Sequence, residues 1–96
     1  MINSKQRSKL RSQAHHLKPA VIVGKSGLTD GTFTSINQAL DSHELIKIKF
    51  NSSKDQKKSF IENIDKELSS YIVGDIGHTI IIYRRHEDPK KRKYLK

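Results

Sequence analysis

The sequence predicts an α/β fold, a two-layer sandwich in which helices pack on one mixed four-stranded sheet. The main observation is that the spacing of apolar residues alternates along the chain between the period of a helix and that of a strand. The length of 96 residues suits a single domain with one core. The chain has no cysteine and no apolar run of about 18 residues, which argues against a disulfide framework or a membrane-spanning helix. The expected order is α-β-α-β-α-β-β, with at least two crossover connections.

The first predicted helix covers residues 4–14. Its apolar side chains recur at the spacing of one helix face, and Ser4 can cap its first turn. Pro19 ends the helix because the residue before a proline is pushed into an extended conformation. A short β-prone run over residues 20–23 follows as the first strand.

A second helix and a second strand come next. Thr29 is the expected cap of the helix, Asp30 suits its first turn, and the helix ends near His43. Isoleucine and phenylalanine alternate with lysine over residues 45–50, which predicts a half-buried strand.

The remaining elements are a third helix and two strands. Residues 54–69 have the apolar spacing of a helix, and a strand begins at residues 71–73. Gly74 and Gly77 interrupt this strand and predict a bulge or bend before the next one. The apolar run over residues 79–83 predicts a central strand of the sheet.

Positive charge is concentrated at the two ends of the chain. Lysine and arginine number 19 against 10 aspartate and glutamate, a net charge of +9. Residues 1–18 carry +5 and residues 84–96 another +5, whereas the segment between them has −1. Clustered cations favour a polyanionic partner because binding releases condensed counterions. The alternative is that this charge only aids solubility or marks an unstructured tail, and the run Lys-Lys-Arg-Lys after Pro89 predicts a frayed end.

The candidate for specific binding is the loop Gly24-Lys25-Ser26-Gly27, between the first strand and the second helix. Glycine at both ends allows positive φ and a close approach of a ligand to the backbone. The helix that follows offers unpaired amides, and Lys25 adds a full charge, which together suit a phosphate. The spacing alone is equally consistent with glycines that serve only the geometry of the loop.

Other functional classes find no support in the sequence. A nucleotide-binding P-loop needs a second glycine ahead of Gly24-Lys25, where this chain has Ala20 and no glycine, and no G-x-G-x-x-G dinucleotide fingerprint occurs. The five histidines lack metal-ligand spacing, and no acid–base pair or nucleophile triad is legible. Aromatic residues are few, so contacts with a nucleic-acid backbone are more plausible than base stacking. We therefore expect no enzyme activity, no cofactor, no metal, and no small-molecule substrate.

Several segments together resemble the YhbY-like CRM domain family, whose name refers to chloroplast RNA splicing and ribosome maturation. The resemblance covers about residues 2–85, and its most specific part is LKPAVIVGKSGLT over residues 17–29. The other segments are KQR (5–7), LR (10–11), AHHLKP (14–19), HELIK (43–47) and GHTIIIYR (77–84). The resemblance implies a fold like the C-terminal domain of translation initiation factor three. It also implies RNA binding and association with precursors of the large ribosomal subunit.

The resemblance further implies that the glycine loop contacts RNA as the corresponding loop of KH domains does. We expect an RNA-binding domain over residues 2–85 and a basic tail over 86–96. The expected RNA contacts are Gly24, Lys25, Ser26, Gly27, Thr29, Lys18, Arg7, Arg11 and Arg84.

Three functions remain open at this point. The first is an RNA-binding factor that associates with large-subunit ribosomal RNA and assists ribosome assembly. The second is a module that docks on a ribosomal or other acidic protein through an exposed sheet face, with incidental RNA affinity. The third, a small phosphoryl-handling enzyme using Lys25, lacks a general base. No apolar stretch follows the basic N-terminus, so we expect no secretory signal, no membrane partner and a cytoplasmic location.

Overall fold

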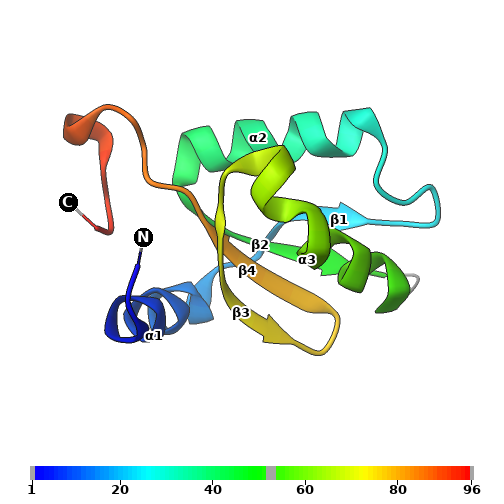
Figure 1. Cartoon of the computed structure of the whole chain (residues 1–96), viewed down its shortest axis with the longest axis horizontal. Helices are drawn as coiled ribbons and strands as arrows, with labels where there is room; N and C mark the ends of the chain where they lie inside the picture. The colour runs from blue at the N-terminus through cyan, green and yellow to red at the C-terminus, as the bar shows by residue number, and fades with distance from the viewer. Residues whose placement is uncertain (1, 52–53, 96) are drawn as a thin grey trace.

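The protein is built on a four-stranded mixed sheet flanked by helices, as seen in a computed structural model that describes residues 2–51 and 54–95 (Figure 1). The fold class and element order predicted from the sequence are confirmed. The elements are α1 (Ser4–Gln13), a 3-10 turn (Ala14–His16), β1 (Pro19–Val23), α2 (Asp30–His43), β2 (Leu45–Phe50), α3 (Lys54–Leu68), β3 (Tyr71–Ile76), β4 (Thr79–Tyr83) and a second 3-10 turn (Pro89–Lys91).

The sheet has the strand order β1-β2-β4-β3. β1 and β2 are parallel neighbours joined through α2. β4 pairs antiparallel with both β2 and β3, so it is central, as its apolar run predicted. The pairing of β3 with β4 shifts register between Ile72 and Gly74, which is the bulge expected at this glycine.

The main core lies between the sheet and the two helices α2 and α3. The ring of Phe60, on α3, has its centroid 6.2 Å from that of Phe33 on α2 and 5.7 Å from that of Phe50 on β2. The buried members of this core are Val23, Ile36, Leu40, Ile46, Ile48, Phe50, Phe60, Ile64, Leu68, Ile80 and Ile82. Apolar side chains from β1, β2 and β4 therefore hold α2 and α3 on the same face of the sheet.

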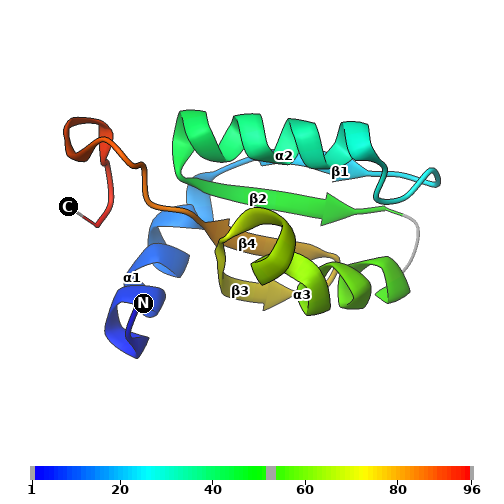
Figure 2. The same cartoon turned by 45° about the horizontal axis from the view of Figure 1, so that its top comes forward.

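The first helix packs on the opposite face of the sheet, against one end of it (Figures 1 and 2). Its cap is Asn3 rather than the expected Ser4. The Asn3 side chain accepts a hydrogen bond from the Gln6 amide at 2.8 Å, and the Gln6 side chain accepts one from the Asn3 amide at 3.0 Å. Leu10 and Ala14 bury the inner face of the helix in a second apolar cluster with Leu45 and Tyr83.

The basic tail is folded, so the prediction of a frayed end is wrong. The side chain of Glu44, only 1% exposed, accepts hydrogen bonds from the amides of His86 at 2.7 Å and Lys93 at 2.6 Å. Leu95 enters the second apolar cluster, and the Tyr94 ring meets that of Tyr83 edge-on at 6.4 Å. A carboxylate far upstream in the sequence thus holds the tail against the sheet.

Within the described ranges, no helix combines the length and the apolar character needed to cross a membrane.

Tyr83 is buried with a polar group that lacks a partner. Among the described residues, none makes a hydrogen bond of good geometry with its phenol oxygen, although the Arg85 side chain and the Leu95 backbone lie near it. Burial raises the pKa of Tyr83 above its ordinary 10.0, although the nearby Arg85 opposes this shift. Because the folded-state pKa is raised, the folded protein disfavours the phenolate more strongly than the unfolded chain does. This contribution to stability is present below about pH 10 and is lost as the pH rises through the folded-state pKa.

We predict that Tyr83→Phe leaves the protein at least as stable at neutral pH, because it removes an unsatisfied buried hydroxyl. Between about pH 9 and pH 11, the melting temperature of the variant falls less than that of the wild type. Thermal denaturation followed by circular dichroism measures both effects, with Tyr71→Phe as a control for the loss of a phenol. If the melting temperatures of wild type and Tyr83→Phe fall equally over this pH range, the pKa of Tyr83 is not raised in the folded protein.

Candidate nucleic-acid interface

The glycine loop forms an exposed turn at one end of the molecule, where β1 leads into α2 (Figure 1). The Gly27 amide donates a hydrogen bond to the Gly24 carbonyl at 3.0 Å, which leaves Lys25 and Ser26 at the tip, both exposed. Gly27 has φ +75°, in the left-handed region that favours glycine. At Gly24, no atom lies within 4 Å of the position that a Cβ would take. Gly27 is therefore required by the turn itself, whereas Gly24 keeps an open approach to the backbone.

The turn is fixed to the start of α2 by two threonines. Thr29 caps the helix, since its hydroxyl accepts from the Thr32 amide at 3.2 Å and its carbonyl accepts from the Phe33 amide at 3.1 Å. The Thr32 hydroxyl donates to the Gly27 carbonyl at 3.2 Å. This geometry gives Thr29 a capping role. The cap does not use the first two amides of the helix, which point toward the loop end as a helix N-terminus does.

The charges at this corner have opposite signs. Lys25 is exposed at the tip, and Asp30 is exposed in the first turn of α2. The Asp30 carboxylate stabilises the helix N-terminus but competes with any anion for it. The corner is thus suited to one phosphate of a longer polyanion rather than to tight capture of a small free anion.

The other expected contacts on the N-terminal side do not lie beside the loop. Lys18 is exposed but precedes β1, so the whole five-residue strand, about 16 Å long, separates it from Gly24. Arg7 and Arg11 are exposed on α1, which lies at the opposite end of the molecule from the loop in both Figures 1 and 2.

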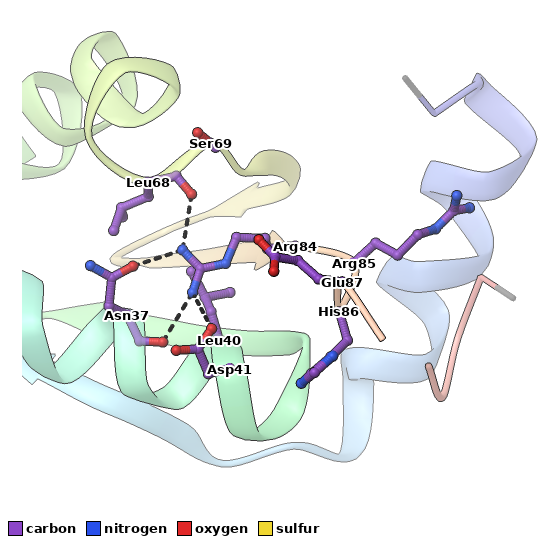
Figure 3. Close-up of a pocket in the computed structure, with 9 residues that line it drawn as sticks. All are labelled: Asn37, Leu40, Asp41, Leu68, Ser69, Arg84, Arg85, His86 and Glu87. Atoms are coloured by element: carbon purple, nitrogen blue, oxygen red, sulfur yellow. Dashed lines mark hydrogen bonds and ion pairs between the residues drawn. The ribbon is translucent and has the colours of Figure 1, made fainter. Parts of the chain in front are cut away.

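Arg84 is held inside the protein by four hydrogen bonds (Figure 3). One guanidinium nitrogen donates to the Asn37 side chain at 2.7 Å and to the Leu68 carbonyl at 3.1 Å. The other donates to the Asn37 carbonyl at 3.1 Å and to the Asp41 carboxylate at 2.9 Å. The side chain is 21% exposed. Arg84 thus links α2 to the end of α3, and the geometry gives it a structural role.

Both basic ends of the chain lie together, away from the loop (Figures 1 and 2). The molecule is 37 Å long, and α1 and the tail occupy the end opposite the glycine loop. Screening limits the reach of exposed charges to about 8 Å at physiological ionic strength. The basic ends and the loop therefore cannot act on the same phosphate and can act only on separate parts of a long polyanion.

A stretch of uncovered sheet lies between these two regions. α1 and the tail cover only one end of the sheet face that α2 and α3 leave free, and the rest of that face carries lysines at alternate positions of β2. We call this part of the sheet the open face. Ile22, Lys49 and Ile76 are exposed in it, Lys47 and Thr79 are half-buried, and Ile81 is buried at its floor. The alternation of lysine with apolar residues over 45–50 predicts that Lys47 and Lys49 lie on one face of a strand. That β1 and β4 are the neighbours of this strand is known only from the structure.

One comparison decides the family. Residues 2–84 match the family model of the CRS1 / YhbY (CRM) domain. The chain belongs to this family. The CRM domain of this protein therefore includes the glycine loop, the open face and Arg84, while the tail that follows packs on it through Glu44.

Two bacterial relatives and one solved structure are similar to this CRM protein over nearly their whole length. A Haemophilus influenzae protein called an RNA-binding protein is 39% identical over 90 residues, covering 93% of this chain and 91% of its own. A Bacillus subtilis protein, called a probable RNA-binding protein, is 37% identical over 92 residues, with coverage of 95% and 96%. The solution structure of a Staphylococcus aureus protein superposes with a TM-score of 0.79 at 32% identity, over 99% of this chain and 100% of that one.

The described part of the CRM protein contains no group of three or more histidine or acidic side chains arranged to hold a metal ion.

We predict different outcomes for the two loop glycines. Gly27→Ala lowers the free energy of unfolding by about 1–2 kcal/mol, because alanine resists the left-handed conformation. Gly24→Ala changes it by less than about 0.5 kcal/mol, because the added methyl enters open space. Urea denaturation of both variants measures the difference, and equal losses would contradict the division of roles.

We predict that Arg84→Ala lowers the free energy of unfolding by about 1–3 kcal/mol, because acceptors on α2 and α3 lose their shared donor. Arg84→Lys recovers only part of this, since an ammonium lacks the planar fork. RNA affinity should not change in Arg84→Lys. If Arg84→Lys loses RNA affinity while its free energy of unfolding is unchanged, Arg84 contacts RNA directly.

Proposed function

We propose that this protein binds RNA and that the loop Gly24–Gly27 contacts a backbone phosphate. The observation that carries the proposal is the exposed turn itself, with open space at Gly24 and Lys25 at its tip, ahead of the N-terminus of α2. Membership of the CRM family supports it, as do the RNA-binding names of the relatives.

The chemistry of the loop favours the backbone over the bases. The loop offers a cation and backbone amides but no aromatic ring on which a base could stack. Phosphate contacts of this kind position a nucleic acid without reading its sequence. Lys18, Arg7 and Arg11 then contribute as separate contacts farther along the strand, and Thr29 contributes by holding the turn in place. RNA binding of this kind uses no catalytic step, no cofactor and no metal.

We further propose that the RNA is ribosomal RNA of large-subunit precursors and that binding assists ribosome assembly, in the cytoplasm. The support is the resemblance to bacterial single-domain CRM proteins, which covers residues 2–85. The competing hypothesis, docking on an acidic protein with incidental RNA affinity, rests on Ile22 and Ile76, which are 58% and 64% exposed. The two hypotheses differ because only RNA binding depends on the glycine loop.

We predict that Lys25→Glu weakens binding of a single-stranded RNA about tenfold, because a phosphate contact becomes a repulsion. The slope of log affinity against log salt also becomes shallower by about 0.7, the share of one phosphate on a single strand. Fluorescence anisotropy over a salt series measures both quantities. Lys91→Glu, the same charge change in the 3-10 turn of the tail, is the control and should cost less.

In cell extracts, Lys25→Glu should also abolish co-sedimentation with large-subunit precursors. If Lys25→Glu binds RNA and sediments like the wild type, the loop is not the contact. If a precursor association survives both Lys25→Glu and nuclease treatment, protein docking is the better explanation.

A further inference from the structure

The register of the sheet arranges the open face in two rows. Alternate residues of a strand point to the same face, so partners across the strands can be followed from one edge of the sheet to the other. One row runs Ile22, Lys49, Thr79, Ile76 from β1 to β3. The next runs Pro19, Lys47, Ile81, Gly74. The third row, with Leu45, Tyr83 and Tyr71, lies beneath α1 and the tail.

The outer row places apolar and cationic groups side by side. Ile22 on edge strand β1 and Ile76 on edge strand β3 are the large apolar side chains with high exposure among the described residues, at 58% and 64%. Exposed Lys49 lies between them in the register. The two isoleucines stand on opposite edge strands with Lys49 and Thr79 between them, so they offer two separate apolar contacts beside a cation rather than one contiguous patch.

A shallow groove joins this row to the first helix. Arg11 and His15 line one side of it, and Lys47 and Lys49 line its floor together with Ile81. Lys47 donates to the His15 carbonyl at 3.3 Å, which fixes the end of the helix against the floor. Gly74 contributes by having no side chain, since a Cβ there would lie 2.9 Å from the Ile81 side chain.

No acidic side chain lines this groove in the part of the chain that the structure describes. Asp75, the nearest acid on β3, takes part in an ion pair with Lys57 of α3, on the other side of the sheet. The groove therefore has one sign of charge, which selects an anionic occupant.

The open face also adjoins the proposed phosphate contact. Ile22 lies two residues before Gly24 on the same strand, and its partner Lys49 directly precedes Phe50, at the same end of β2. Lys49, Lys47 and Arg11 line one groove, and Lys25 lies in the loop beyond the end of β1 at which Ile22 pairs with Lys49. This continuity favours one extended polyanion over separate ligands.

We propose that a single-stranded RNA segment crosses the open face from the glycine loop toward Arg11. Its phosphates contact Lys49 and Arg11, and its bases or riboses lie against Ile22 and Ile76. A duplex would present phosphates outward and leave the isoleucines in water, whereas a single strand exposes base faces that apolar side chains can cover. The inference rests on the proposed function, since it extends the strand held at the loop.

The test compares oligouridine probes of two lengths. A 4-mer can occupy little more than the loop, whereas a 12-mer can also reach the open face, and single-strand sites of this range are common. Fluorescence anisotropy gives affinities for the wild type, for Lys49→Glu and for the double variant Ile22→Ser, Ile76→Ser. Lys58→Glu, an exposed lysine on α3 and therefore on the helix side, is the charge control. All substituted side chains are exposed or partly exposed, and circular dichroism verifies folding.

We expect the wild type to bind the 12-mer at least about tenfold more tightly than the 4-mer. Lys49→Glu should lose at least about fivefold for the 12-mer and little for the 4-mer, and Lys58→Glu should resemble the wild type. The double isoleucine variant should lose about three- to tenfold for the 12-mer and nothing for a 12-base-pair RNA duplex. Amide NMR shifts of Gly74 and Thr79 on addition of the 12-mer give a second readout that needs no variant.

Three results would overturn the inference, and each is distinct. If Lys25→Glu loses 12-mer affinity while the open-face variants and amide shifts do not respond, the loop proposal stands and the path is wrong. If no variant alters binding of either probe, the proposed function itself fails. If the open-face variants keep 12-mer affinity but lose a nuclease-resistant association with large-subunit precursors, the occupant of the face is a protein.

Discussion

The buried carboxylate of Glu44 is the constraint on which the arrangement of this protein depends. Glu44 ends α2 and immediately precedes β2, with a φ of 64° that a non-glycine residue adopts only at a cost of about 1–3 kcal/mol. Its backbone bonds to Leu40 and Arg84 hold this conformation, and its side chain accepts two amides of the tail. Burial of a charged group costs several kcal/mol, which such charge-assisted bonds, at about 1.5–3 kcal/mol each, can offset. One residue therefore joins the end of α2 to β2 and, together with the packing of Leu95, holds the tail on the sheet.

The effect of the basic groups on a ligand depends on the distances between them as much as on their charge. The net charge of +9 suggests a uniformly basic protein, but α1 and the tail are at one end of a 37 Å axis and the glycine loop at the other. With a screening length of about 8 Å, these groups are independent of one another in solution. Their energies add only through a ligand long enough to touch several of them. An extended strand meets this condition, and a mononucleotide does not.

The sequence was sufficient for the elements and for the loop, because periodicity and capping are local. Thr29 as a cap, the bulge at Gly74 and the central position of β4 all follow from near neighbours. The placement of the tail does not, because His86 and Glu44 are 42 residues apart and neither has a local signal for the other. The hydrogen bonds of Arg84 could not be predicted for the same reason, since Asn37 lies 47 residues away. Periodicity shows that α1 has a buried face. Which face of the sheet it covers depends on contacts with residues far away in the sequence.

The positions of the two chain ends have a practical and a modular consequence. Ile2 and Leu95 are buried in the same apolar cluster, so both termini emerge at the end of the molecule that is remote from the glycine loop. A fluorophore, an affinity resin or a flexible linker fused to either terminus would leave the loop unobstructed. Domains joined in tandem through these ends would likewise keep their glycine loops away from the linkers.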